Sequence, residues 1–209
     1  NVHPSLLPDL RGAAPVQWAL LRGYRRTGIT TQFMQKEMDA GDVLLQEEHE
    51  VGENESAREL LERFSVEGGK LLVKTLDGLE AGAIKPSPQD HSKATFASML
   101  AKDMGLLHFV ENDAWTTHNQ VRGLFPWPGA YAFLNKKRIK LLRTAMARAA
   151  THRSPPGTFW FEEDRMFVSC REGTLEVLEL QPEGKRPMLP REFRNGINKT
   201  EDRFDTPGE

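Results

Sequence analysis

The strongest constraint on the fold is a change of pattern on the two sides of a proline-containing segment, residues 86–98. Before it, helical and strand patterns alternate; after it, short strand patterns follow one another with turn residues between them. Pro86 and Pro88 each lack an amide hydrogen, so neither a helix nor a central strand continues through them. The pattern predicts a linker at 86–98 between two domains, residues 1–85 and 99–209, and 209 residues are enough for two small cores.

Residues 1–85 show the pattern of an α/β domain, with helical spacing in some stretches and β-branched residues in others. The expected elements are a helix at 14–23, strands at 28–34 and 43–51, and a longer helix from Asn54 or Ser56 to Gly82. Either Asn54 or Ser56 can accept a backbone N–H bond at a helix start. Gly68 and Gly69 are unfavourable inside a helix, but leucines at helical spacing follow them, so the helix is expected to continue.

Residues 99–209 show one helical pattern, at 113–124, followed by several short strand patterns. The expected strands lie at 130–133, 139–142, 158–161, 166–170 and 175–180. Short strands at this spacing predict a small β-barrel or sandwich. Trp127, between two prolines, is expected to pack in the core or between the domains, and the polar residues 198–209 are expected to form a loose tail.

Composition excludes several classes of protein. No apolar run approaches the roughly 18 residues that span a bilayer, and neither a P-loop nor a Gly-x-Gly-x-x-Gly fingerprint is present. The six histidines show no close metal-ligand spacing, so no metal site is expected. Cys170 is the single cysteine, which excludes an intramolecular disulfide, and its apolar neighbours predict a buried, unreactive thiol. We expect a monomer in the reducing cytoplasm or an organelle matrix.

The formal net charge of −2 hides an uneven distribution along the chain. Residues 1–98 carry 11 basic and 15 acidic side chains, whereas residues 99–209 carry 17 basic and 15 acidic ones. The basic excess concentrates in an eighteen-residue run that contains seven cations and no acidic residue: Lys136, Lys137, Arg138, Lys140, Arg143, Arg148 and Arg153. Protein surfaces usually mix both signs. The run therefore predicts a polyanionic partner, and nucleic acid is the commonest one.

Three polar residue types in the first part could supply the chemistry of acyl transfer. Asn1 and His3 offer an amide and an imidazole, and Asp39 offers a carboxylate further along the chain. Acyl transfer needs a group that stabilises the oxyanion, a group that moves protons and a group that orients them. Taken separately, each has a structural explanation, because a lone histidine is usually structural and Asp39 or Asp42 would equally make a turn.

Four motifs of the first part resemble the folate-dependent formyltransferase family, since they occur in the order and spacing of that family. They are Asn1–Pro8 (NVHPSLLP), Arg11–Pro15 (RGAAP), Thr27–Thr30 (TGIT) and Met38–Asp42 (MDAGD). The second part contains Val121–Ala130 (VRGLFPWPGA) and Leu180–Met188 (LQPEGKRPM), followed by Phe193 and Gly196. These motifs are similar to the C-terminal domain of the family members that formylate methionyl initiator tRNA. The resemblance covers the chain except its tail.

The resemblance implies a fold and a reaction. The fold is the C-terminal half of a Rossmann-like formyltransferase domain, followed by a small OB-like β-barrel that binds tRNA. Family members carry about one hundred residues, the first half of the Rossmann-like domain, before the Asn-x-His motif, which leaves open whether residues 1–209 are active alone. The implied reaction moves the formyl group of 10-formyltetrahydrofolate, the co-substrate, to the amino group of methionyl initiator tRNA in translation initiation, without a metal.

The resemblance also implies roles for particular residues. Asn1 would hold the formyl oxygen, His3 would donate a proton or stabilise the developing charge, and Asp39 would orient His3 and a water and help to deprotonate the attacking amine. Asp42 is left out of the site. The loop residues expected to contact tetrahydrofolate are Ser5, Leu6, Leu7 and Pro8. The cations expected to bind tRNA are Lys136, Lys137, Arg138, Lys140, Arg143, Lys185 and Arg186.

Other functions remain open from the sequence. A formyltransferase acting on a sugar nucleotide, or a formyl-folate hydrolase, would carry the same Asn1, His3 and Asp39, although the Gln181–Met188 motif and the basic second part argue against both. A nucleic-acid-binding fragment without catalysis is a third possibility, because Asn1 and His3 are expected to be poorly held without upstream strands.

Overall fold

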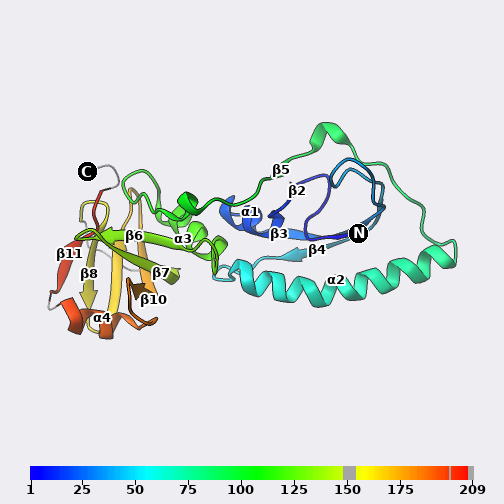
Figure 1. Cartoon of the computed structure of the whole chain (residues 1–209). Helices are drawn as coiled ribbons and strands as arrows, with labels where there is room; N and C mark the ends of the chain where they lie inside the picture. The colour runs from blue at the N-terminus through cyan, green and yellow to red at the C-terminus, as the bar shows by residue number, and fades with distance from the viewer. Residues whose placement is uncertain (148–153, 198, 207–209) are drawn as a thin grey trace. The chain divides into compact units, whose positions relative to one another are not determined.

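The structure is a computed structural model that describes residues 1–147, 154–197 and 199–206. Arg148 and Arg153 of the cationic run lie outside the described residues. The chain forms two compact units, Asn1–Leu100 and Ala101–Glu209, each with its own apolar core (Figure 1). In the described parts of the chain, no helix is long and apolar enough to cross a membrane.

The first unit is a mixed α/β structure with two small sheets. Its elements are β1 (Val2–His3), β2 (Arg11–Gly12), α1 (Pro15–Leu21), β3 (Arg26–Gln32), β4 (Val43–Glu50), α2 (Ala57–Glu80), the 3₁₀ turn η1 (His91–Lys93) and β5 (Phe96–Ala97). One sheet has the order β1-β3-β4 and is antiparallel, whereas β2 and β5 form a parallel pair. Both helices and both long strands lie where the sequence pattern predicted them.

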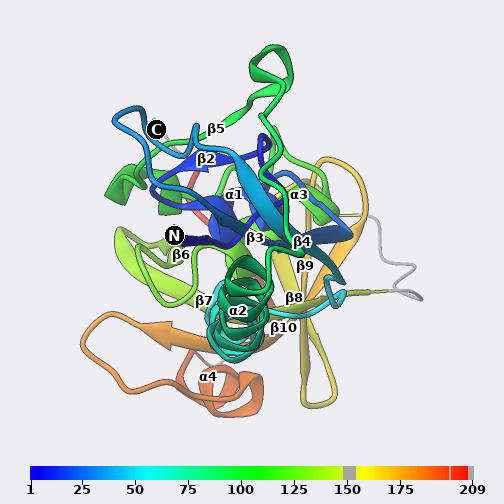
Figure 2. The same cartoon turned by 90° about the vertical axis from the view of Figure 1, so that its right-hand side faces the viewer.

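Helix α2 is a single helix of 24 residues whose ends follow from its sequence. Ser56 and Glu59 form a capping box, in which each side chain accepts the other residue's backbone N–H. The helix ends at Glu80, and Gly82 then takes a left-handed conformation with φ of 66°. Figure 2 looks along α2, which packs on β3. The buried face comprises Ala57, Leu60, Phe64, Gly68, Leu71 and Thr75.

Residues 86–98 are not the free linker that their prolines suggested. Ser87 exchanges two backbone hydrogen bonds with Val43, of 2.8 and 2.9 Å. The side chain of Gln89 is buried, and β5 at the end of the segment pairs with β2. Pro86 and Pro88 lie on either side of Ser87, so the Ser87 amide keeps the hydrogen that this pairing needs, and the short bridge can form. The segment therefore belongs to the first unit.

The second unit is one antiparallel sheet with helices packed on it. Its elements are the 3₁₀ turn η2 (Lys102–Gly105), α3 (Ala114–Gly123), β6 (Ala130–Leu134), β7 (Lys137–Met146), β8 (Thr158–Glu162), β9 (Arg165–Ser169), β10 (Thr174–Pro182), α4 (Pro190–Ile197) and β11 (Glu201–Arg203). The strand order is β11-β8-β9-β10-β7-β6, and the sheet is curled (Figure 1). The structure confirms the predicted helix and all five predicted strands, whereas α4 and β11 were not expected.

The described part of the chain end is not the loose tail that was expected for residues 198–209. β11 pairs with β8, and Phe204 is 3% exposed, with its ring stacked on that of Phe109 at a centroid distance of 5.4 Å. Asp205 donates its backbone N–H to the carbonyl oxygen of Phe133 in β6 over 2.7 Å. Because β11 and β6 are the two outer strands of the sheet, this bond joins its edges.

Trp127 and Cys170 can be compared with their expected burial. Trp127 is 53% exposed, so it is not a core residue of the second unit. Cys170 is buried, with its Sγ 3.7 Å from the Thr117 hydroxyl. Burial raises the pKa of this thiol to about 12. The thiol therefore stays protonated and unreactive at neutral pH, as its sequence context predicted.

Candidate active site

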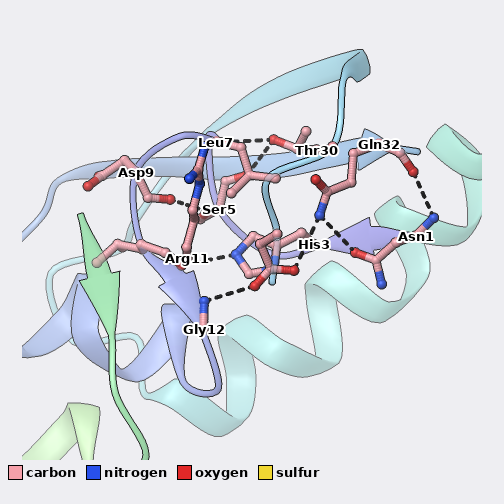
Figure 3. A network of polar contacts seen from close by, with 12 residues as sticks. Asn1, His3, Ser5, Leu7, Asp9, Arg11, Gly12, Thr30 and Gln32 are labelled. Atoms are coloured by element: carbon pink, nitrogen blue, oxygen red, sulfur yellow. Dashed lines mark hydrogen bonds and ion pairs between the residues drawn. The ribbon is translucent and has the colours of Figure 1, made fainter. Parts of the chain in front are cut away.

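Strand β1 places Asn1 and His3 on the same face of the first sheet, because residues two apart in a strand point the same way. The pairing of β1 with β3 puts His3 opposite Thr30. Beyond it, the Asn1 amino group donates to the Gln32 carbonyl over 2.9 Å, and the Gln32 N–H donates to the Asn1 carbonyl over 3.0 Å (Figure 3). The expectation that both residues would be poorly held is therefore wrong, since β3 supplies the pairing.

The His3 ring lies between a backbone carbonyl and a carboxylate, with 6% of its side chain exposed. Its Nε2 is 3.0 Å from the carbonyl oxygen of Leu10, and its Nδ1 is 3.6 Å from Oδ1 of Asp39. A carbonyl oxygen only accepts hydrogen bonds, so Nε2 carries a hydrogen and donates it. In the neutral ring Nδ1 then carries no hydrogen, and this is the atom that faces the Asp39 carboxylate.

Asp39 is held in place by both of its carboxylate oxygens. Oδ2 accepts the backbone N–H of Gly12 over 2.8 Å, and Oδ1 accepts a hydrogen bond from Gln32 Nε2 over 3.3 Å. Gly12 has a φ of 119°, and a Cβ there would lie 2.6 Å from the carbonyl oxygen of Ala97. Only glycine can therefore present this N–H to the carboxylate. The carboxylate is thus oriented towards His3 before any ligand binds.

A network of amides behind these groups was missed by sequence reasoning. Gln32 Nε2 donates to Oδ1 of both Asn1 and Asp39, each over 3.3 Å. Gln89 donates to Gln32 Oε1 over 3.2 Å, and Arg11 donates to Gln89 Oε1 over 2.7 Å. Arg11 and Gln89 are only 3% and 7% exposed. The sequence marks Arg11 only as a member of the Arg11–Pro15 motif, and no sequence signal pairs Gln32 with Gln89.

The bond from Gln32 decides which way the Asn1 amide points. Because Oδ1 of Asn1 accepts this bond, the Nδ2 hydrogens of Asn1 point elsewhere, and Nδ2 has no partner among the residues that the structure describes. Asn1 is exposed, whereas His3 is buried. An available N–H donor beside a buried imidazole is an arrangement suited to stabilise charge on a carbonyl oxygen.

The loop between β1 and β2 contains the four residues expected to contact folate. The Thr30 hydroxyl donates to the Ser5 carbonyl over 2.6 Å and accepts the Leu7 N–H over 3.1 Å, which fixes the loop on β3. Ser5 and Leu7 are buried, with exposed fractions of 1% and 4%. Leu6 and Pro8 keep part of their surface exposed. The second pair is therefore the one available to a ligand.

Most of the cations expected to bind tRNA lie on one hairpin of the second unit. Lys136 is in the β6–β7 turn, and β7 carries Lys137, Arg138, Lys140 and Arg143. Arg138 and Lys140 alternate with the buried residues Ile139 and Leu141. Because side chains alternate along a strand, both cations point to the outer face of the hairpin.

That outer face also carries two aromatic rings. Tyr131 and Phe133 of β6 lie on it, and the Arg138 guanidinium is 5.5 Å from the centre of the Tyr131 ring. Interleaved basic and aromatic side chains are typical of surfaces that bind nucleic acid. The neighbouring strand β10 places Glu179 opposite Arg143, so the face is not purely cationic.

Lys185 and Arg186 follow β10 and differ in their availability. Arg186 forms an ion pair with Glu192 at 2.5 Å. The N–H of Leu189 and the Arg186 guanidinium together hold the pKa of Glu192 below its ordinary value, so this pair stays charged at neutral pH. Lys185 has no ion pair within the described ranges. Lys185 is therefore the freer of the two cations.

Known proteins with similar sequences define the class to which this chain belongs. The family model "Formyl transferase" matches residues 1–76, and "Formyl transferase, C-terminal domain" matches residues 99–198. The chain belongs to the formyltransferase family. The methionyl-tRNA formyltransferase of Thermodesulfovibrio yellowstonii is 40% identical to it over 206 residues. That alignment covers 98% of this chain, and the chain spans 65% of the length of that relative.

Solved structures share the fold at lower identity. HypX from Aquifex aeolicus, in complex with tetrahydrofolic acid, matches with a TM-score of 0.70 at 18% identity, over 95% of this chain and 35% of that one. WlaRD, a sugar 3N-formyl transferase solved with dTDP and 5-N-formyl-THF, matches with a TM-score of 0.70 at 20% identity, over 89% of this chain and 65% of that one. These likenesses show a formyltransferase fold.

Proposed function

We propose that the chain takes part in transfer of the formyl group from 10-formyltetrahydrofolate to the amino group of methionyl initiator tRNA, in translation initiation. The observation that carries this proposal is the convergence of Asn1, His3 and Asp39, all oriented through hydrogen bonds before a substrate binds. The sequence relative named above supports tRNA as the acceptor. The folate-bound structures with the same fold support a folate donor.

The proposed reaction begins when the amine nitrogen attacks the formyl carbon and gives a tetrahedral intermediate. Asn1 Nδ2–H and a proton on His3 Nδ1 stabilise the negative charge on the formyl oxygen. Asp39 holds that imidazolium and accepts the proton of the attacking nitrogen, through a water that it orients. The bond between the formyl carbon and N10 then breaks, and N10 takes up the proton that Asp39 accepted, returned through the same water, so that the carboxylate is regenerated. The products are tetrahydrofolate and formylmethionyl-tRNA.

The two units divide the substrates in this proposal. Leu6 and Pro8 contact the folate through their exposed surface, while Ser5 and Leu7 support the loop from inside. The hairpin cations and Lys185 bind the tRNA backbone through their charge. Arg186 contributes less to this binding, because its guanidinium is already paired with Glu192. No metal takes part. The protein works as a monomer in the cytoplasm or an organelle matrix.

The fold fits the proposal at the level of domains. We assign the first unit to the C-terminal half of a Rossmann-like domain and the second to an OB-like barrel. The bond from Asp205 to Phe133, which joins the sheet edges, supports the barrel. OB-like barrels commonly bind single-stranded nucleic acid on their sheet face, which is where the interleaved basic and aromatic side chains lie.

A formyl-transfer assay with methionyl initiator tRNA and 10-formyltetrahydrofolate tests the function. It is run on the chain and on the chain extended by the N-terminal third of the Thermodesulfovibrio relative. We expect His3→Ala and Asp39→Ala to lower kcat about 10² to 10³-fold in the active form, whereas Met38→Ala, at a residue 70% exposed, leaves it unchanged. Wild-type turnover in either site variant, or no formylation in either form, would overturn the proposal.

A sugar-nucleotide acceptor is the second candidate, because the fold likeness to WlaRD is as strong as that to HypX. The same assay with a dTDP-linked amino sugar separates the two acceptors. Formylation of the sugar and not of the tRNA would assign the chain to this second function.

A further inference from the structure

The second unit contains a pocket that the proposed formyl-transfer chemistry does not use. It has a volume of about 580 Å³ and lies between α4, the β6–β7 hairpin and the loop after β10. This volume falls within the roughly 300 to 1,000 Å³ of small-molecule sites. Its wall is apolar, formed by Leu134, Ile139, Met188, Phe193 and Ile197.

The charged side chains of this pocket differ in whether another protein group already binds them. Glu192 is paired with Arg186 and also accepts the N–H of Leu189, and Glu183 accepts the N–H of Arg138 over 3.2 Å. Lys137 and Lys185, which also line the pocket, form no ion pair with any described residue. Among the described residues, the pocket thus carries two ammonium ions without an ion pair and one carboxylate, that of Glu183, without a paired cation, which leaves a net positive charge beside the apolar wall. A ligand that matches them has a flat apolar body and an anionic group.

We propose that this pocket binds one unstacked nucleotide of the RNA, with its base on the apolar wall and its phosphate between Lys137 and Lys185. This inference rests on the proposed function, from which it takes RNA as the partner. Arg138, the residue next to Lys137, points to the opposite, basic and aromatic face of the same hairpin, so the pocket lies on the other side of the strand that carries those cations. Unpaired bases of RNA are commonly held by apolar and aromatic side chains, while phosphates bind lysines.

Gly196 offers a way to fill the pocket without disturbing the core. It lines the pocket from α4, and a Cβ there would meet no atom within 4 Å. Replacing a helical glycine also favours the helix. Gly196→Trp therefore places an indole in the space assigned to the base. Asn195→Trp is the matched control, because Asn195 is an exposed neighbour on α4 that does not line the pocket.

The binding test uses two fluorescein-labelled probes of equal length, a single-stranded oligoribonucleotide of mixed sequence and an abasic oligonucleotide. Fluorescence anisotropy gives Kd for the whole chain and its variants, and thermal melting confirms that each is folded. We expect Gly196→Trp to weaken binding of the base-bearing probe about tenfold and to leave the abasic probe unchanged. The double variant Lys137→Ala, Lys185→Ala should weaken both probes.

Three results would overturn the inference: no binding of the base-bearing probe by the wild-type chain, equal affinities for Gly196→Trp and Asn195→Trp, or an equal loss for both probes. The formyl-transfer assay separates this failure from that of the proposed function. Formylation of tRNA with an unchanged KM in Gly196→Trp rejects the pocket and keeps the function. Loss of probe binding in Gly196→Trp, in a protein that formylates no tRNA, rejects the function and keeps the pocket.

Discussion

At the scale of single residues, the candidate active site depends on side chains that need not touch a substrate. Gln32 Nε2 carries two hydrogens, and its two hydrogen bonds go to Asn1 and Asp39. One amide therefore sets both the direction of the Asn1 donor and the position of the carboxylate that faces His3. Its own orientation is set by Gln89, which donates to Gln32 Oε1.

We predict that Gln32→Met lowers kcat for formyl transfer about ten- to a hundredfold, because small misplacements of reacting groups are costly. KM for the folate should change much less, since the Leu6–Pro8 surface is held by other bonds. Steady-state kinetics with both substrates varied separates the effect on kcat from the effect on KM. Gln35→Met, at an exposed residue nearby, is the control. A loss of activity that follows a loss of thermal stability would indicate a structural role instead.

The sequence predicts only those residues of the site that belong to recognisable motifs. Asn1, His3 and Asp39 could be named because each belongs to a recognisable motif, and the structure brings them together. Gln32 and Gln89 could not, because their roles arise from the pairing of β1 with β3 and from a buried contact between residues far apart in the chain. Polar contacts over such distances leave no local pattern.

At the scale of elements, the sequence predicts the helices and strands that have a regular period of buried residues, but it does not predict the short strand pairings. The period of buried residues along α2 and its capping box define that helix in the sequence itself. Strand β11 has only three residues, Glu201–Arg203, all of them polar. Its place in the sheet follows from the neighbouring Phe204, which is buried in the core. A strand held by one adjacent side chain and its backbone resembles a loop in the sequence.

The glycine pair inside α2 gives a prediction on stability. A Cβ on Gly69 would meet no atom within 4 Å, whereas a Cβ on Gly68 would lie 3.0 Å from Cγ1 of Val2. Gly69→Ala should therefore raise the free energy of unfolding by about 0.5 to 1 kcal/mol through the better helix propensity of alanine. Gly68→Ala should gain less or lose stability, because β1 must shift. Urea denaturation of both variants checks this, and an equal gain in both would contradict the packing of β1 on α2.

The start of α3 gives a prediction on pH. The N–H of Thr116, followed by its hydroxyl, holds the pKa of Asp113 below its ordinary value. The charged cap therefore stabilises the fold above the ordinary pKa of about 3.9, and this stabilisation disappears as the pH falls through the lower folded value. Asp113→Ala should cost about 1 kcal/mol at pH 7.

The matched variant for this effect is Asp113→Asn, which can cap the helix but does not titrate in this range. The stability difference between wild type and Asp113→Asn should shrink or reverse when denaturation is measured at pH 3 instead of pH 7. Asp164→Asn, at an exposed residue, should show no such change. A constant difference for Asp113→Asn at both pH values would rule out a charged cap.

At the scale of the whole molecule, the two units carry different kinds of site. Asn1–Leu100 contains the polar groups suited to acyl transfer, and Ala101–Glu209 contains the hairpin cations and the apolar pocket. The charge is divided in the same way, since residues 1–98 carry a net negative charge and residues 99–209 a net positive one. In the proposed function, the anionic RNA is attracted to the second unit, and the affinity of that unit raises the local concentration of the acceptor.

This division predicts how salt affects tRNA binding. Each phosphate neutralised by a cation contributes about 0.9 to the slope of log K against log salt concentration. Replacing Arg138, Lys140 and Arg143 by alanine should therefore reduce the slope by up to about 3 and raise KM for the tRNA, with kcat little changed. Replacing Arg25, Lys74 and Lys85, three exposed cations of the first unit, removes the same charge and should change the slope far less. Equal slopes for the two triple variants would show that net charge, and not the hairpin, sets the affinity for RNA.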